Sequence, residues 1–239
     1  MAYYEMFKRD LNRFKNSDNN LSVLPLGSGA LAGNRFKLDR KKMAKNLGFK
    51  EVTQNSIDAV SDRDFIAEMM FNISLASIHL SRISEEFIIW SSSQFNYLEL
   101  PEELCTGSSI MPQKRNPDMA ELVRGGAAKT IGNLVSLLSL LKNQPLAYNR
   151  DNQEDKAPLF ASIDYVLSAI DITSAMVAGA KFNIDEMLND VFDGHICATD
   201  FAEYLVLKGL PFREAHAITG KAVQLLSLIH ISEPTRHDQ

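Results

Sequence analysis

Cysteine is scarce in this chain, which contains only Cys105 and Cys197. The two form neither a Cys-x-x-Cys metal-binding pair nor the framework of a disulfide-rich secreted protein. Apolar runs also stay well short of the roughly 20 residues that a membrane-spanning helix needs, and no secretory signal is recognisable. We therefore expect a protein of the reducing cytoplasm, with no membrane as a partner.

An excess of positive charge is missing as well. The 25 Lys and Arg residues are outnumbered by 30 Asp and Glu, which gives a formal net charge of -5. A general nucleic-acid binder needs a basic surface, so nucleic acid is not expected as a partner. Short basic clusters at residues 8–9 and 40–42 are typical of solvated helix faces. Hydrophobic residues make up 45% of the chain and charged residues 23%, as in a globular protein.

Strand signals are few, because only residues 21–26 form a brief apolar run between turn residues. Helical periodicity dominates instead, with apolar residues at steps of three and four. The longest stripe is predicted to start in a capping box formed by Ser61 and Asp64 and to end at residues 91–93. It comprises Phe65, Met69, Ile73, Ala76, Leu80, Ile83, Phe87 and Trp90.

Two further long helices are predicted. The first begins at residues 116–118, with Asn116 as the N-cap and Pro117 in the first helical position. Its inward residues are expected to be Leu122, Ala127, Ile131, Leu134, Leu138 and Leu141. The second follows Pro158 and is expected to bury Leu159, Ile163, Val166, Ile170, Thr173 and Val177. Three such stripes indicate an all-α fold built as a long-helix bundle.

The predicted helices become shorter after Lys181. Amphipathic segments follow there at residues 184–192, 199–208 and 211–226. We therefore predict a central bundle domain at residues 1–182 and the start of a small C-terminal helical domain at 183–225. Residues 226–239 resemble a translated sequencing adapter (LSLIHISEPTR at 226–236), and a natural terminal helix is the alternative. Helical spacing that is already present at Met1 indicates that earlier turns are missing.

The glycine cluster at residues 27–33 could be mistaken for a phosphate-binding loop. It lacks the spacing of the dinucleotide-binding fingerprint, the Walker lysine and a strand-to-helix setting. A tight turn between helices is the better interpretation.

The residues best suited to catalysis gather at 106–118, where a polar loop that begins with glycine leads into the start of a predicted helix. The loop places hydroxyls, a lysine and an amide beside flexible backbone, which suits removal of a proton next to a carboxylate. Simpler roles exist for individual residues. Asn116 could simply be the N-cap of the following helix, with no role in chemistry. Glu121 could simply be an acid that stabilises the helix dipole.

The loop sequence GSSIMPQKRNPD at 107–118 resembles the signature of the aspartase/fumarase superfamily of lyases. Segments 24–33, 58–64, 147–156 and 212–216 narrow the resemblance to the argininosuccinate lyase family. The similarity covers about residues 2 to 225, roughly the second half of a full subunit. It implies a bundle of the aspartase/fumarase type with a small C-terminal helical domain, truncated at the N-terminus.

The family's reaction is the β-elimination of argininosuccinate to fumarate and arginine, a step of arginine biosynthesis that uses no cofactor or metal. A proton leaves the carbon beside a carboxylate, and preorganised cations and N–H donors must stabilise the resulting dianion. The resemblance implies that Ser108 is the general base and that Lys114 and Asn116 bind the succinyl carboxylates. Ser109 is either a second hydroxyl donor or a spacer.

The resemblance also assigns roles outside the loop. It implies that Glu121 pairs with a catalytic histidine from another subunit, and that Tyr148, Gln153 and Lys156 hold the rest of the substrate. From the residues alone, these last three would be an ordinary polar connection between helices.

None of the five histidines lies in the family's histidine motif, which falls upstream of Met1. Because the family assembles each active site where three subunits of a homotetramer meet, this truncated chain is expected to be inactive and poorly soluble alone. Two alternatives remain open. One is another lyase of the superfamily, such as adenylosuccinate lyase, fumarase or aspartase, and the other is a non-catalytic, crystallin-like relative.

Overall fold

The structure, a computed structural model, describes residues 1–107, 110–111, 114–193 and 197–232. The chain divides into two compact units, which are described separately below. The first unit comprises Met1–Ser92 and Leu100–Lys181, and the second comprises Ser93–Glu99 and Phe182–Gln239.

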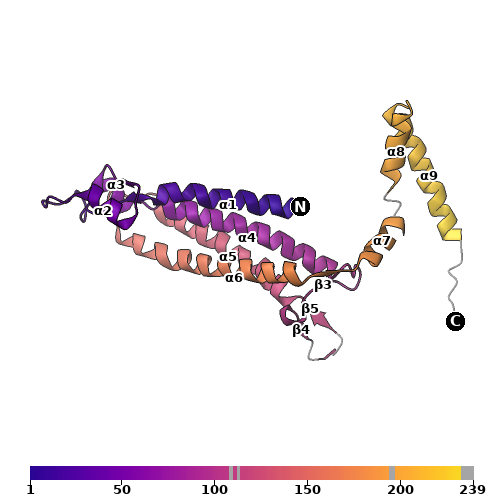
Figure 1. The fold of residues 1–239 in the computed structure, drawn as a ribbon, viewed down its shortest axis with the longest axis horizontal. Coiled ribbons are helices and arrows are strands. Elements are labelled where there is room, and N and C mark those ends of the chain that lie inside the picture. The colour runs from indigo at the N-terminus through magenta and orange to yellow at the C-terminus, as the bar shows by residue number, and fades with distance from the viewer. Residues whose placement is uncertain (108–109, 112–113, 194–196, 233–239) are drawn as a thin grey trace. The chain divides into compact units, whose positions relative to one another are not determined.

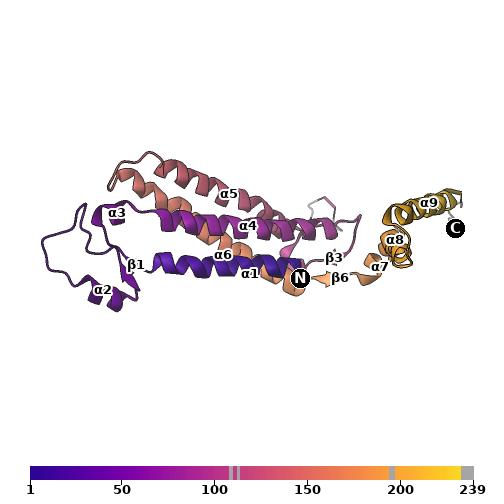
Figure 2. The same cartoon turned by 90° about the horizontal axis from the view of Figure 1, so that it is seen from above.

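Long helices lying alongside one another form the first unit (Figures 1 and 2). These are α1 (Ala2–Leu21), α4 (Asp64–Trp90), α5 (Asp118–Leu141) and α6 (Lys156–Gly179). Helix α4 is central, because it packs against each of the other three. The predicted all-α bundle is confirmed, and the described strands are all only two residues long.

The core of the bundle lies where α4, α5 and α6 meet. One cluster of buried residues contains Ile73, Ala76, Leu80, Val123, Val166 and Ala169, and another contains Ile66, Met70 and Leu137. Full burial of one large aliphatic side chain contributes about 1.5–3 kcal/mol, so these contacts hold the helices together more than helix propensity does.

Polar pairs at regular spacing fix how α1 lies on α4. Three such pairs join the two helices. From one pair to the next, the residue number rises by seven in α1 and falls by seven in α4. The pairs are Tyr3 with Glu86 at 2.7 Å, Asp10 with His79 at 2.7 Å and Ser17 with Asn72 at 2.6 Å. Since seven residues are close to two helical turns, the pairs form one seam between antiparallel helices. His79 is thus a structural residue of this seam, as its position beside the apolar stripe suggested.

Short elements cap one end of the bundle. Strand β1 (Val23–Leu24) pairs in parallel with β2 (Glu51–Val52), beside α2 (Arg40–Leu47) and α3 (Ser56–Ser61). The glycine cluster before α2 is a tight turn, as predicted. Gly29 has a φ of 72°, and a Cβ on it would lie 2.4 Å from the carbonyl oxygen of Gly33. The backbone of the cluster therefore approaches itself so closely at Gly29 that only glycine fits there.

Strand β3 (Leu98–Glu99) of the second unit pairs with β6 (Lys181–Phe182), of which Phe182 is the first residue counted in that unit. The helices that follow are α7 (Ile184–Asp193), α8 (Ala198–Leu207) and α9 (Phe212–Ser232). Helices α8 and α9 pack against each other, with Ala202 and Ala215 buried. The first two helices match the predicted segments to within one residue at each end, while α9 extends beyond residue 226.

The predicted start of α4 is wrong. Ser61 belongs to α3, and its hydroxyl donates to the carbonyl oxygens of Ile57 and Asp58. The carboxylate that accepts from the first N–H of α4 is that of Asp62, 2.8 Å from the nitrogen of Asp64. A separate short helix before α4 therefore replaces the capping box that the sequence predicted.

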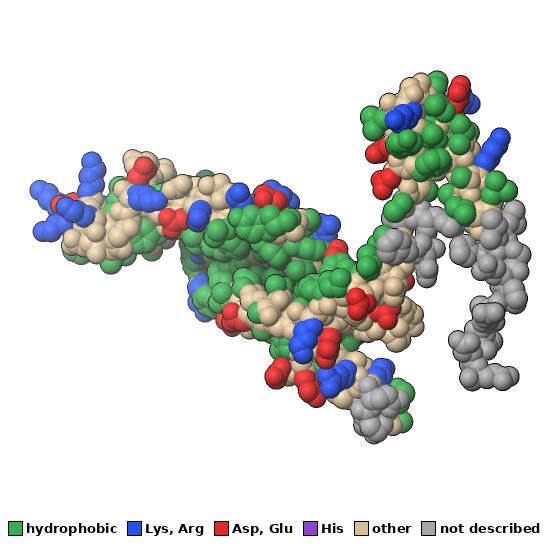
Figure 3. All heavy atoms as spheres, turned by 45° about the vertical axis from the view of Figure 1, so that its right-hand side comes forward, with side chains coloured by type: hydrophobic (Ala, Val, Ile, Leu, Met, Phe, Trp, Pro, Cys, Tyr) green, Lys and Arg blue, Asp and Glu red, His purple; other side chains and the backbone are tan. Residues whose placement is uncertain are grey.

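The inward faces of α5 and α6 are also partly wrong. Leu122, Ile131, Leu138, Ile170 and Val177, all predicted to be inside, are exposed, and so is Phe65 in α4. Most of the residues that lie inside are smaller, although Leu137 and Met176 are also fully buried. The buried residues of the two helices are Ala120, Val123, Ala127, Thr130, Leu137, Ser162, Val166, Ala169, Thr173 and Met176. The larger apolar side chains are left on the surface, where hydrophobic atoms gather over the bundle (Figure 3).

One described stretch, Arg150–Gly179, is long and apolar enough to cross a membrane by length and composition alone. It contains α6, which packs against α4 and α5 in the bundle.

Candidate active site in two segments

The first candidate segment is a hairpin next to the start of α5. Strand β4 (Thr106–Gly107) pairs antiparallel with β5 (Arg115–Asn116), just before α5 begins. Ser108 and Ser109, the proposed base and its neighbour, lie outside the described residues. The backbone N–H of Lys114 donates to the carbonyl oxygen of Met111 at 3.0 Å, which turns the chain back toward β5.

The structure places Asn116 in β5, so its prediction as an N-cap is wrong. Helix α5 begins at Asp118, and Pro117 in the cap position makes no side-chain capping bond. The backbone of Asn116 pairs with Thr106 instead, and its half-buried side chain is not committed to the helix. Thr106 donates its hydroxyl to Asp118 at 2.5 Å, which ties the hairpin to the first turn of α5.

Lys114 and Glu121 are both exposed at this end of the bundle. Neither makes an ion pair with another residue that the structure describes. Arg124, one turn after Glu121, pairs with Glu85 at 2.7 Å. The hydrogen bond that Arg124 donates to the Glu85 carboxylate is the main cause that raises the pKa of Arg124, and the charge of Glu121 adds a smaller effect. Glu121 is therefore an exposed acid, and Arg124, on which its charge acts, is already paired with Glu85.

The second candidate segment surrounds η2 (Arg150–Asp155), a short 3-10 helix that runs into α6. Gln153 donates a hydrogen bond from Nε2 to the hydroxyl of Tyr148, so these two predicted site residues are in contact. Lys156, the first residue of α6, lies with its Nζ 3.0 Å from Oδ1 of Asp155. The structure thus brings Tyr148, Gln153 and Lys156 together on one short segment.

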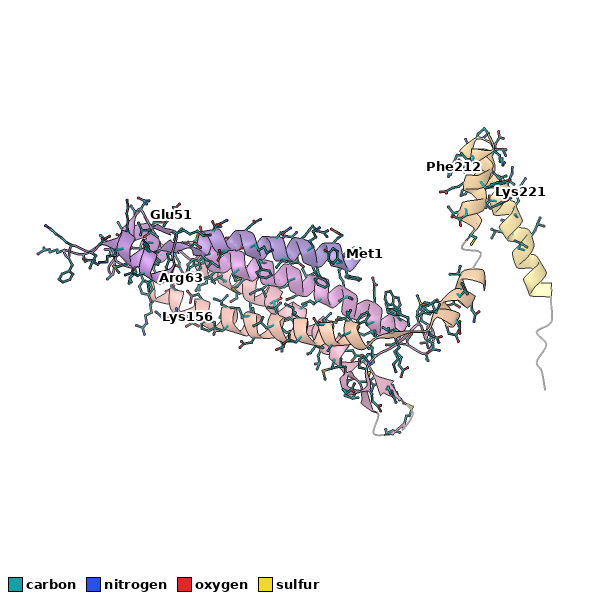
Figure 4. The ribbon with its side chains drawn as sticks, viewed as in Figure 1. Met1, Glu51, Arg63, Lys156, Phe212 and Lys221 are labelled. Atoms are coloured by element: carbon teal, nitrogen blue, oxygen red, sulfur yellow. The ribbon has the colours of Figure 1, made fainter. Side chains whose placement is uncertain are left out.

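Residues that the sequence did not single out support this second segment. Asp155 is buried, and its Oδ2 lies 2.6 Å from Nε of Arg63, which reaches it from the start of α4. Figure 4 shows Arg63 and Lys156 at the same end of the bundle. Asn152 is fully buried, and neither atom of its amide has a hydrogen-bond partner among the described residues. Only burial, which one sequence does not reveal, distinguishes these residues from other polar ones.

The two segments do not meet within one chain. Helix α5 contains 24 residues and runs from the first segment toward the second. At 1.5 Å per residue it separates them by about 36 Å. A small substrate cannot span that distance, so a site that uses both segments needs them from different copies of the chain.

An apolar groove of the first unit is lined by none of these residues. It holds about 590 Å³ between α1, α4 and α6, with an apolar lining that includes Phe7, Phe14, Leu80 and Ile170. Asp10 is its one carboxylate, and that group is already paired with His79 and Arg13. Such a lining suits helix packing and not an anionic substrate.

Comparison with known proteins shows the family to which the chain belongs. Residues 1–132 match the family described as "Lyase", and residues 195–233 match the family described as "Argininosuccinate lyase C-terminal". The chain is 53% identical over 223 residues to the argininosuccinate lyase of Desulfatibacillum aliphaticivorans, which covers 93% of this chain and 48% of that protein. The chain thus spans about half the length of the relatives that it matches.

Solved structures show the same arrangement of helices. The crystal structure of EDDS lyase in complex with formate superposes with a TM-score of 0.88 at 30% identity, over 94% of this chain and 45% of that one. A class II fumarase from Schistosoma mansoni shares the fold, with a TM-score of 0.78 at 17% identity over 96% of this chain and 51% of that one. The chain belongs to the lyase family and, within it, to the argininosuccinate lyases.

Proposed function

We propose that the whole protein cleaves argininosuccinate to fumarate and arginine, and that this chain supplies two segments of its active site. The observation that carries the proposal is the pair of segments at the two ends of α5. One holds Lys114 and Asn116, which belong to the same loop sequence (107–118) as Ser108, and the other holds Tyr148, Gln153 and Lys156. Together they offer two cations and several hydrogen-bonding groups to a substrate that carries carboxylates at both of its ends.

The reaction is a β-elimination. Ser108 removes the proton from the carbon beside one succinyl carboxylate, and the C–N bond at the neighbouring carbon then breaks. The electron pair of the C–H bond becomes the double bond of fumarate, and the departing nitrogen takes a proton to give arginine. Lys114 and Asn116 stabilise the negative charge that builds up on the carboxylate, and the N–H groups at the start of α5 add to their effect.

The other residues have supporting roles in this proposal. Glu121 pairs with a histidine contributed by another subunit, while Tyr148, Gln153 and Lys156 hold the arginine part of the substrate. Ser109 is a second hydroxyl donor or a spacer. The elimination is acid–base chemistry and needs neither cofactor nor metal.

We also propose that the protein is a cytoplasmic homotetramer in which each site takes segments from three subunits. The separation of the two segments by α5 supports such sharing, since one copy cannot close the site. Exposed apolar residues on α5 and α6, such as Leu122, Leu138 and Val177, supply surface for packing between copies.

The test is a chimera in which this chain replaces the matched region of the Desulfatibacillum aliphaticivorans protein. The purified chimera is expected to release fumarate from argininosuccinate, followed by ultraviolet absorbance. The variant Ser108→Ala should reduce kcat by a factor of about 100 or more, because it removes the general base. This chain alone serves as the baseline and is expected to release almost no fumarate. A folded chimera that leaves argininosuccinate intact, or a fully active Ser108→Ala variant, would disprove the proposal.

A further inference from the structure

The carboxylate of Asp155 lies between two cations. Its Oδ2 is 2.6 Å from Nε of Arg63, and its Oδ1 is 3.0 Å from Nζ of Lys156. The side chain of Asp155 is 2% exposed and that of Arg63 is 15% exposed, whereas that of Lys156 is 53% exposed. The contact therefore joins a buried ion pair to an amine that solvent and ligands can reach.

Local helix chemistry does not account for this arrangement. Lys156 places a positive charge at the N-terminus of α6, where the helix dipole disfavours cations. The first turn of α6 holds no acidic residue, and Asp155 in the N-cap position makes no capping hydrogen bond. Asp155 is thus committed to the two cations and not to the helix that it precedes.

Arg63 is itself held in place by the backbone at the start of α4. It occupies the N-cap position of α4, the central helix of the bundle, and its NH1 donates to the carbonyl oxygen of Asp62 at 2.6 Å. Arg63 also decides the charge of the cluster. Two cations and one carboxylate leave a net charge of +1, so Asp155 can hold Lys156 in place without cancelling its attraction for an anion.

We infer that Asp155 and Arg63 are positioning residues, which hold the Lys156 ammonium in the direction that binds a carboxylate of the substrate. This inference rests on the proposed function, because it needs Lys156 to be a substrate ligand. It adds two residues on different elements, far apart in sequence, that do not touch the substrate themselves.

The test compares variants of the active chimera. Lys156→Ala should raise the KM for argininosuccinate strongly, and Asp155→Asn should raise it about tenfold while kcat changes less than about threefold, as expected when only binding is lost. The double variant should resemble Lys156→Ala alone, because Asp155 acts through Lys156. Arg63→Lys should recover most of the affinity that Arg63→Gln loses.

Asp10→Asn is the matched control. Asp10 is also a buried carboxylate between two partners, Arg13 and His79, but it lies in the seam between α1 and α4. A structural role alone would make Asp155→Asn behave like Asp10→Asn, with a lower melting temperature and an unchanged KM. That result, or additive effects of Asp155→Asn and Lys156→Ala, would overturn the positioning role alone. An unchanged KM in Lys156→Ala would instead refute the proposed role of Lys156, and the inference with it.

A second measurement does not depend on activity. Amine acetylation of this chain, read by mass spectrometry, reports how firmly Lys156 is held, with exposed Lys129 on α5 as the internal reference. Asp155→Asn should increase the labelling of Lys156 relative to Lys129 by roughly two- to fivefold, the range expected from losing a partly exposed ion pair. An unchanged ratio would show that Asp155 does not hold Lys156.

Discussion

The residues of the second segment differ in how far they are exposed to solvent. Lys156 and Gln153 are exposed, whereas Asp155 and Asn152 are buried beneath them. The family resemblance, and not residue type, predicted the exposed ones as ligands. The partner of Asp155 could not be predicted, because Arg63 lies 92 positions away and only the fold brings the two together.

Asn116 shows a local rule that the fold overrides. An Asn before Pro at the start of an apolar stripe is a typical N-cap signal, and it predicted the start of α5 to within one or two residues. The pairing of Asn116 with Thr106 then placed its backbone in a strand. The hairpin that causes this depends on residues ten positions earlier, which a capping rule does not consider.

Tyr165 gives a prediction at the scale of one residue. Burial raises its pKa to about 12, and its hydroxyl donates to the carbonyl oxygen of Val123 at 2.5 Å. Between pH 10 and 12 the unfolded chain releases this proton while the folded chain keeps it, so stability should fall as the pH rises through that window. Tyr3, whose pKa is also raised to about 12 by burial and by its bond to Glu86, adds to the same loss.

The measurement is the melting temperature from pH 8 to pH 11.5. Tyr165→Phe should have a flatter decline above pH 10 than the unaltered chain, and Tyr4→Phe, which removes an exposed hydroxyl from α1, should decline as the unaltered chain does. Identical curves for Tyr165→Phe and the unaltered chain would contradict the role given to Tyr165.

At the scale of elements, the long helices were predicted well and their faces were not. The spacing of apolar residues is enough to indicate a helix, but α5 and α6 are apolar on more than one side. Which side faces inward depends on how closely the neighbouring helices approach. Large residues such as Leu122 and Val177 were expected inside, while Ala120 and Ala169 fill the actual contacts.

The contact between α5 and α6 gives a prediction for Gly126. A Cβ at this position would lie 2.1 Å from Cε2 of Tyr165, so no side chain fits without moving the tyrosine ring. Gly126→Ala is expected to lower the free energy of unfolding by about 1–3 kcal/mol through overpacking. The measurement is thermal or urea-induced unfolding of the chain.

Gly132 is the matched control on the same helix. No atom lies within 4 Å of a Cβ placed there, so Gly132→Ala should raise the free energy of unfolding by about 0.5–1 kcal/mol through lower backbone entropy. Equal effects of the two substitutions would show that α5 and α6 do not meet as closely as described.

At the scale of the whole molecule, the candidate site is divided by the length of α5. The sequence and its resemblance predicted both groups of residues, but only the structure shows how far apart one chain holds them. The β4–β5 hairpin and the segment around η2 lie at separate ends of α5 in each copy. The proposed sharing between copies rests on this distance, and it can be tested without any structure of the assembly.

The most direct test mixes two variants of the active chimera that are each defective at a different end. Ser108→Ala carries an intact second segment, and Lys156→Ala carries an intact first one. The assay uses a substrate concentration well below the raised KM of Lys156→Ala, so that each variant alone has little activity. Co-assembly of equal amounts should restore up to about a quarter of the sites, because a site works when its two segments come from the two complementary chains. Activity equal to the average of the two separate variants would contradict the account, since it would mean that each chain builds its site alone.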